Sequence, residues 1–137
     1  MNQTIHSCTI ISIPKIQDYR GNLGVIEKNI LPFKVKRVYY LYDVPSGSVR
    51  GGHAHKKLHQ FLIALSGSFD VILKDGVKEK AVTLNNPSEG LLITHGIWRE
   101  LENFSSGSIC LVLASEVFDE DDYIRSFVEF KDSKTTK

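Results

Sequence analysis

The chain has 137 residues, a size that fits one domain and is large enough to bury a hydrophobic core. With 42% hydrophobic and 24% charged residues, its composition is that of a folded globular protein rather than a disordered one. A formal net charge of +1 argues against general affinity for nucleic acid or membranes, because neither would meet a sustained basic face. No apolar run has the length of a membrane span and the N-terminus lacks the layout of a signal peptide, so the sequence predicts a cytoplasmic protein.

Short runs rich in β-branched and aromatic residues follow one another along the chain, separated by turn signals of glycine, proline, serine and asparagine. We predict strands at residues 22–27, 37–44, 59–65, 68–74, 79–84, 90–94 and 108–115. Closely spaced short strands of this kind favour an antiparallel sandwich or barrel. Only the tail, 116–130, suggests a helical turn or two, with acidic residues 119–122 near its start, where the helix dipole favours them. No linker or repeat interrupts the pattern, so one all-β domain over 1–137 is expected.

The two cysteines, Cys8 and Cys110, lie far apart, and each belongs to an apolar run. They form no C-x-x-C pair, which would suggest a metal or redox site. We therefore predict reduced, buried thiols rather than a disulfide.

The stretch RGGHAHKKLHQ (50–60) holds three of the five histidines of the chain. His53 and His55 stand two apart, so on a strand they project to the same face. An imidazole with a pKa near ~6.5 can accept and donate a proton at neutral pH, which makes acid–base catalysis one interpretation. An exposed strand end beside a hydrogen-bonded core histidine is the other, and the two residues alone leave both open.

The spacing of this stretch resembles the first motif of the cupin barrels, G-x5-H-x-H-x3/4-E-x6-G. Position 60 and four residues fall on that motif: Gly47, His53, His55 and Gly67. Position 99 and two residues fall on the second cupin motif, P-x-G-x2-H-x3-N: Gly96 and Asn103. The resemblance implies an all-β cupin, or jelly-roll, barrel with a short C-terminal helical segment, and places both histidines inside it.

The departures from the cupin motifs argue against a metal. The metal-binding glutamate and histidine are replaced here by Gln60 and Arg99, and Thr94 stands in place of the proline of the second motif. A guanidinium cannot ligate a metal ion and repels it electrostatically. His59 and His95 could in principle substitute, but alternation puts His59 on the strand face opposite Gln60. We therefore expect no metal and no other cofactor.

Two long segments, 37–73 and 91–125, resemble the nucleotide-sugar 3,4-ketoisomerases, and the likeness begins near residue 18. It includes the R-G-x-H-A-H-K-K form of the first motif. The resemblance implies an isomerase that moves the ketone of dTDP-4-keto-6-deoxyglucose from C4 to C3 without redox cofactor or metal. It places the base on His53, with His55 and Tyr39 as proton shuttle or oxyanion donors. Alternation separates Tyr39 from Tyr40, so only one of the two tyrosines should face a ligand.

Three arginines are candidates for binding the anionic substrate. Arg20 and Arg50 each precede a glycine and could reach a diphosphate through their forked donors. Arg99 occupies an inward-facing motif position, where an unpaired guanidinium is costly. Because alternation puts Glu100 and Glu102 on the opposite face, a ligand is the expected partner of Arg99.

Three further residues are weaker candidates for contact with a dTDP-sugar. Lys56 could attract phosphate, and Tyr19 and Trp98 could pack on the thymine or the sugar. A solvated side chain is the alternative for Lys56, and simple core packing for the two aromatic residues.

Three other functions stay open: a metal-dependent cupin enzyme, a non-catalytic sugar-nucleotide-binding module, and a nucleotide-sugar 3,5-epimerase. Within the ketoisomerases, galacto-forming relatives are expected to carry W-H-E where this chain has W-R-E at 98–100. We therefore expect the gluco product, dTDP-3-keto-6-deoxyglucose, rather than the galacto one. The family also implies a homodimer, and its members can exchange N-terminal strands. The run CTIISI (8–13) is apolar enough to be buried by a partner sheet.

Overall fold

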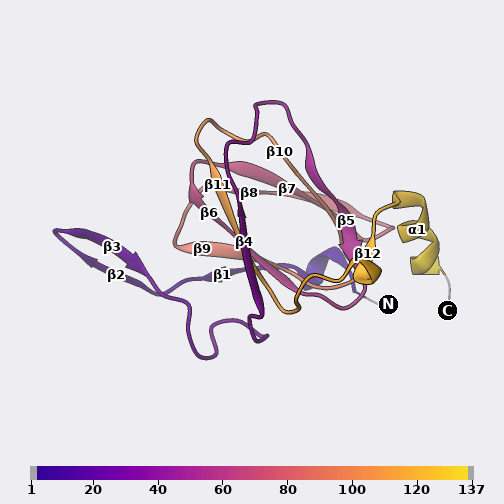
Figure 1. Cartoon of the computed structure of the whole chain (residues 1–137), viewed down its shortest axis with the longest axis horizontal. Helices are drawn as coiled ribbons and strands as arrows, with labels where there is room; N and C mark the ends of the chain where they lie inside the picture. The colour runs from indigo at the N-terminus through magenta and orange to yellow at the C-terminus, as the bar shows by residue number, and fades with distance from the viewer. Residues whose placement is uncertain (1–2, 136–137) are drawn as a thin grey trace.

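Two five-stranded antiparallel sheets face each other across a hydrophobic core (Figure 1). The computed structural model describes residues 3–135. The strands of the first sheet are, in spatial order, β1 (Thr9–Ser12), β9 (Glu89–Ile93), β6 (Gln60–Ser66), β11 (Ile109–Ala114) and β4 (Arg37–Leu41). Those of the second are β12 (Tyr123–Ile124), β5 (Arg50–His55), β10 (Trp98–Glu102), β7 (Phe69–Lys74) and β8 (Glu79–Leu84). This is the expected all-β cupin jelly roll.

Four smaller elements complete the structure. A hairpin of β2 (Lys15–Asp18) and β3 (Gly21–Gly24) projects from one end of the barrel, as Figure 1 shows. A 3-10 helix, η1 (Ile5–Ser7), precedes β1, and a second one, η2 (Glu120–Asp122), leads into β12. The only α-helix among the described residues, α1 (Phe127–Thr135), lies at the end opposite the hairpin. No helix within residues 3–135 is long and apolar enough to cross a membrane.

Strict alternation along the strands decides which side chains enter the core. In β7 the inward residues Phe69, Val71 and Leu73 are fully buried and the residues between them are half-buried. The outer face of the first sheet carries a second apolar cluster, which residues 26–35 cover. On the outer face of the second sheet, Trp98 packs with Phe130 of α1. The inward face of the barrel, where the two sheets meet, carries the buried polar residues His53, His55, Gln60 and Arg99.

The predicted strands are confirmed, with shifted ends. The strand expected over 37–44 stops at Leu41, because Asp43 has a left-handed backbone (φ 54°) that breaks the extended chain. The strand expected over 22–27 ends at Gly24. The helical segment expected within 116–130 is split into η2 and an α1 that continues to Thr135. The apolar run 8–13 forms β1, which pairs with β9 of the same chain.

Both cysteines are buried and free, as the sequence predicts. Burial raises the pKa of the Cys110 thiol to about 12, with the nearby Arg99 acting weakly in the opposite direction. At neutral pH Cys110 is therefore a protonated core residue and not a nucleophile.

Candidate active site

A β-bulge in β5 sets up the polar interior of the barrel. Between β5 and β10 the register shifts, because Arg99 pairs with His53 whereas Leu101 pairs with Arg50. Gly51 lies in this bulge with φ 72°, a conformation that favours glycine. A β-carbon there would lie 2.5 Å from Nη1 of Arg99. The glycine thus provides the space that the guanidinium occupies.

His53 and Arg99 face each other across β5 and β10 in the barrel interior. Their side chains are only 7% and 3% exposed. Nε2 of His53 and both Nε and Nη1 of Arg99 have no hydrogen-bond partner among the described residues. Burial first, and then the charges of Arg99, His55 and Arg125, lower the pKa of His53 to about 2. At neutral pH His53 therefore holds a free lone pair beside a permanent cation with unused donors, an arrangement that suits a ligand able to become anionic.

The Tyr39 hydroxyl is held from two sides. Nη2 of Arg99 donates to it at 3.2 Å, and Nε2 of Gln60 donates to it at 3.3 Å. Because the hydroxyl oxygen accepts both bonds, its own proton remains available for donation into the site. Tyr40, its neighbour on β4, is 60% exposed on the outer face. The prediction that only one of the two tyrosines faces the interior is confirmed, and it is Tyr39.

His55 is buried between an acid and an amide. Its Nδ1 lies 3.0 Å from Oδ2 of Asp122, and its Nε2 lies 3.4 Å from Nε2 of Gln60. Burial lowers the pKa of His55 to about 4; the hydrogen bond to Asp122 raises it and the charge of Arg99 lowers it further. Burial thus outweighs the carboxylate, and His55 is neutral at pH 7.

Tyr123 of β12 covers both histidines. Its ring centroid is 4.9 Å from that of His53 and 4.4 Å from that of His55. Nη1 of Arg37 donates to its hydroxyl at 3.5 Å, and the guanidinium of Arg125 lies 4.1 Å from its ring centroid. Tyr123 therefore forms an aromatic wall of the site, with one cation over its ring face and another at its hydroxyl.

The structure does not bring every predicted residue to this cluster. Tyr19 is 97% exposed, and Arg20 forms an ion pair with Asp18 at 2.7 Å, both at the tip of the β2–β3 hairpin. Figure 1 shows that tip pointing away from β5 and β12. Arg50 and Lys56 are exposed at the start of β5 and just after its end.

The structure places Trp98 in a packing role, which the sequence left open as the alternative to contact with a ligand. Alternation in β10 turns Arg99 inward and Trp98 outward, where Trp98 is 4% exposed. The indole packs against Phe127 and Phe130 of α1, and its Nε1 donates to Glu100 at 2.8 Å. Trp98 is thus a packing residue on the outer face of the sheet.

Four residues of the cluster have no predicted site role: Arg37, Gln60, Asp122 and Tyr123. In the sequence, Gln60 stands out only as the replacement of a metal-binding glutamate, and Asp122 only as part of an acidic run at a helix start. The contact between His55 and Asp122 joins residues 67 apart, so no local pattern indicates it. The sequence did contain one indication of a role for Asp122 and Tyr123, because 121–125 belongs to the segment that resembles the ketoisomerases.

The donor set fits acid–base chemistry better than metal binding. Within residues 3–135, no three His, Cys, Asp or Glu side chains are grouped so that they could hold a metal ion. Arg99 occupies the place where a metal-binding cupin has its second-motif histidine, and a guanidinium has no lone pair to offer.

The fold and the site together define a cupin barrel with buried acid–base side chains. A sequence model of the FdtA family, described as WxcM-like, C-terminal, matches residues 6–135. A TDP-4-oxo-6-deoxy-alpha-D-glucose-3,4-oxoisomerase from Aneurinibacillus thermoaerophilus is 47% identical over 123 residues, covering 89% of this chain and 88% of that relative. The chain therefore belongs to this family of nucleotide-sugar 3,4-ketoisomerases and is an enzyme.

Solved structures agree with this assignment. QdtA, a sugar 3,4-ketoisomerase from Thermoanaerobacterium thermosaccharolyticum in complex with TDP, has a TM-score of 0.93 and 45% identity, with 95% of this chain and 96% of that chain covered. A histidine-to-asparagine variant of QdtA was solved with TDP-4-keto-6-deoxyglucose (TM-score 0.91, 45% identity, 93% of each chain). The WlaRB TDP-quinovose 3,4-ketoisomerase from Campylobacter jejuni has a TM-score of 0.87 and 46% identity, with 91% of this chain and 97% of that chain covered.

Proposed function

We propose that this enzyme moves the ketone of dTDP-4-keto-6-deoxy-D-glucose from C4 to C3 by metal-free acid–base catalysis centred on His53. The single observation that carries the proposal is the pairing of a buried imidazole nitrogen with a buried guanidinium, the first nitrogen and two of the guanidinium nitrogens having no partner within residues 3–135. A native protein rarely leaves such groups unsatisfied, and a ligand, an ordered water or an ion usually completes them. The substrates named for relatives, TDP-4-keto-6-deoxyglucose among them, are of the kind that would do so.

The reaction proceeds through an enediol(ate). The 4-keto group acidifies the C3 hydrogen, which His53 removes as a proton, and the negative charge spreads onto O4. Arg99 and the Tyr39 hydroxyl donate to that oxygen. His55 carries the O3 proton to O4, and His53 returns a proton to C4, so that C3 becomes the ketone. Every atom is accounted for, and no electron leaves the sugar.

The low pKa of His53 suits the free enzyme, in which the imidazole must be unprotonated, and we expect this pKa to rise during the reaction. A pKa of about 2 keeps the imidazole unprotonated, with its lone pair ready. A base this weak would be inefficient if the value persisted, since catalysis is best when the pKa lies near the operating pH. The enediolate charge forms beside Arg99 and offsets its repulsion of a protonated His53. The proton affinity of His53 therefore rises as the proton is transferred.

The favoured product is dTDP-3-keto-6-deoxy-D-glucose. Both epimers share the enediol, so the face of C4 that receives the proton decides the configuration. Arg99 fixes a bulky, non-titrating cation beside His53, where a histidine in galacto-forming relatives would supply a second proton donor. The likeness to a TDP-quinovose ketoisomerase supports the same outcome, since quinovose is 6-deoxyglucose.

The hairpin supports a homodimer with exchanged N-terminal strands. All eight residues of β2 and β3 are exposed, including Ile16 and Leu23. An isolated two-stranded hairpin is marginally stable at best, so a second copy of the chain is the expected cover. In such a dimer Tyr19 and Arg20 would reach the partner's site, where Arg20 and Arg50, with Lys56, bind the diphosphate. Sedimentation at micromolar concentration tests this arrangement, and a monomer would contradict it.

Turnover of dTDP-4-keto-6-deoxyglucose in deuterated water, followed by NMR, tests the function. We expect deuterium at C4 of a 3-keto sugar, undiminished activity in excess chelator, and H4 couplings of a gluco configuration. His53→Asn should abolish turnover and keep TDP binding, whereas His6→Asn, the same change on the surface, should alter neither. Activity that disappears on chelation and returns with one metal would refute the mechanism, and deuterium at C5 would indicate an epimerase.

A further inference from the structure

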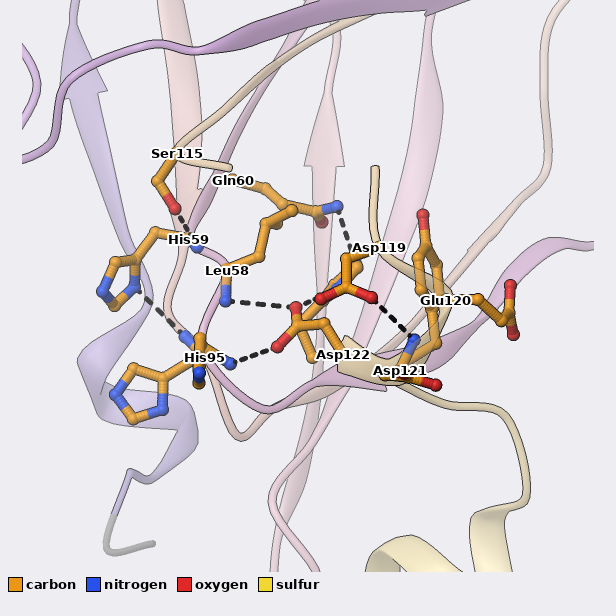
Figure 2. A network of polar contacts seen from close by, with 12 residues as sticks. Leu58, His59, Gln60, His95, Ser115, Asp119, Glu120, Asp121 and Asp122 are labelled. Atoms are coloured by element: carbon orange, nitrogen blue, oxygen red, sulfur yellow. Dashed lines mark hydrogen bonds and ion pairs between the residues drawn. The ribbon is translucent and has the colours of Figure 1, made fainter. Parts of the chain in front are cut away.

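Asp122 lies at the end of a short helix, but it is buried and has more hydrogen-bond partners than a surface acid in that position usually has. It is nearly fully buried, and its two carboxylate oxygens face three nitrogens. Oδ1 accepts from the backbone N–H of Lys57 at 2.8 Å, and Oδ2 accepts from that of Leu58 at 3.4 Å (Figure 2). The third nitrogen is Nδ1 of His55, 3.0 Å from Oδ2. One side chain thus joins η2, the turn after β5 and a histidine of the site.

This geometry determines which nitrogen of His55 carries the proton. An ionised carboxylate can only accept, so Nδ1 must be the N–H that donates to Asp122. Because burial keeps His55 neutral, Nε2 then has no proton and presents a lone pair. The amide nitrogen of Gln60 is a donor compatible with that lone pair, and at 3.4 Å the contact is long enough for a sugar hydroxyl to take its place. The same amide reaches the Tyr39 hydroxyl, so Nε2 of His55 lies on the interior side of the cluster.

We propose that Asp122 is a positioning residue that fixes His55 in the Nδ1–H tautomer, so that Nε2 can accept the oxygen-bound proton of the sugar. The proposal rests on the proposed function only for the shuttle role of His55. The backbone N–H groups of Lys57 and Leu58 prevent the carboxylate from rotating away. The carboxylate therefore sets both the tautomer and the ring orientation, as acids paired with histidines do in other active sites.

A purely structural role is the competing explanation, and Asp122→Asn separates the two. The amide keeps one acceptor, which the shorter bond assigns to Lys57, and its NH2 group replaces Oδ2 opposite His55. An NH2 group donates to Nδ1, so His55 must move its proton to Nε2. The lone pair of His55 then lies on Nδ1, where it faces the new amide and not the substrate. We expect kcat to fall by about 10²–10⁴-fold, as when the acid of a catalytic triad is replaced by its amide, with little change in KM.

The matched control is Asp121→Asn, the same change at an exposed residue on the same 3-10 turn. Its effect on kcat should be less than twofold. A loss of kcat in Asp122→Asn without a change of tautomer would show that the acid acts only through the fold, and would overturn the proposal. An unchanged kcat in a folded Asp122→Asn protein would overturn it as well.

The tautomer is measured directly by ¹⁵N NMR of labelled histidine, with the His55 signals assigned by their loss in His55→Gln. At pH 7 the unmodified protein should show His55 protonated on Nδ1 and not on Nε2. A Nε2–H tautomer or an imidazolium would overturn the proposal even if Asp122→Asn does not fold. This readout needs no turnover, so an enzyme inactive on the proposed substrate would refute the proposed function and still allow the tautomer to be tested.

Discussion

Arg99→Met should make the enzyme more stable and far less active. Met has a similar length but no charge and no donors. Among the residues that the structure describes, the buried guanidinium bonds only to Tyr39, and its Nε and Nη1 have no partner. An uncompensated buried cation is costly, and replacing buried ionic groups by apolar ones is often neutral or stabilising by about 1–4 kcal/mol. For a chain of this size, each kcal/mol raises Tm by roughly 2–4 °C.

The same substitution should lower kcat. Arg99 is one of the donors assigned to the enediolate, and removing one such donor lowers kcat by about 10²–10³-fold, equivalent to about 2.7–4 kcal/mol. The pKa of His53 should rise as well, because the charge of Arg99 is the second cause of its depression after burial.

The assay combines thermal unfolding without ligand and initial rates of isomerisation. Lys131→Met, which removes a charge from an exposed position on α1, is the control and should change neither Tm nor kcat. A variant with lowered Tm would show that Arg99 is satisfied in the free protein, and a variant with unchanged kcat would show that it does not stabilise the enediolate. Either result would refute the reasoning.

Three further outcomes are expected. Arg99→His, alone or with a further change at Tyr19, should move the product toward the galacto sugar, read from the H4 couplings; an unchanged product would show that neither residue controls the face of C4. The free energy of unfolding should fall as the pH drops from 6.5 toward 5, by up to about 1.4 kcal/mol per pH unit for each histidine, because the unfolded chain binds protons that His53 and His55, with pKa values lowered to about 2 and 4, do not. When the free energy of unfolding is measured with urea at several pH values, that of His53→Asn should depend less steeply on pH than that of the unmodified protein. An equal pH dependence would contradict the assignment. Gly51→Ala should lower both Tm and kcat, since it strains a backbone at φ 72° and places a methyl group 2.5 Å from the Arg99 guanidinium; unchanged values would show that the bulge adapts freely.

Local patterns delimited β3, β4, β6, β7, β8, β9 and β11, but not β1, β2, β5, β10 or β12. They were sufficient for the orientation of most site residues. Alternation predicts a shared inward face for His53 and His55, and it separates Tyr39 from Tyr40. The same rule, with Arg99 inward, points Trp98 outward and so favours core packing over stacking on a ligand, the two alternatives that were open for Trp98. Strand ends were less predictable, because single left-handed residues such as Asp43 end a strand without changing the hydrophobic pattern.

The sequence by itself determined the period-two strands, the buried thiols and the replacement of metal ligands by Gln60 and Arg99, because each depends on residue type and on neighbours along the chain. Only the tertiary structure decided that Asp122 reaches His55 and that Tyr123 covers both histidines, since these contacts join β5 to a tail far away in the chain. Hydrogen bonds between distant segments depend on how the sheets pack and where the chain returns, and no periodicity records either. The fold therefore distinguishes the two histidines: Nε2 of His53 has no hydrogen-bond partner within residues 3–135, whereas Nδ1 of His55 lies 3.0 Å from Asp122.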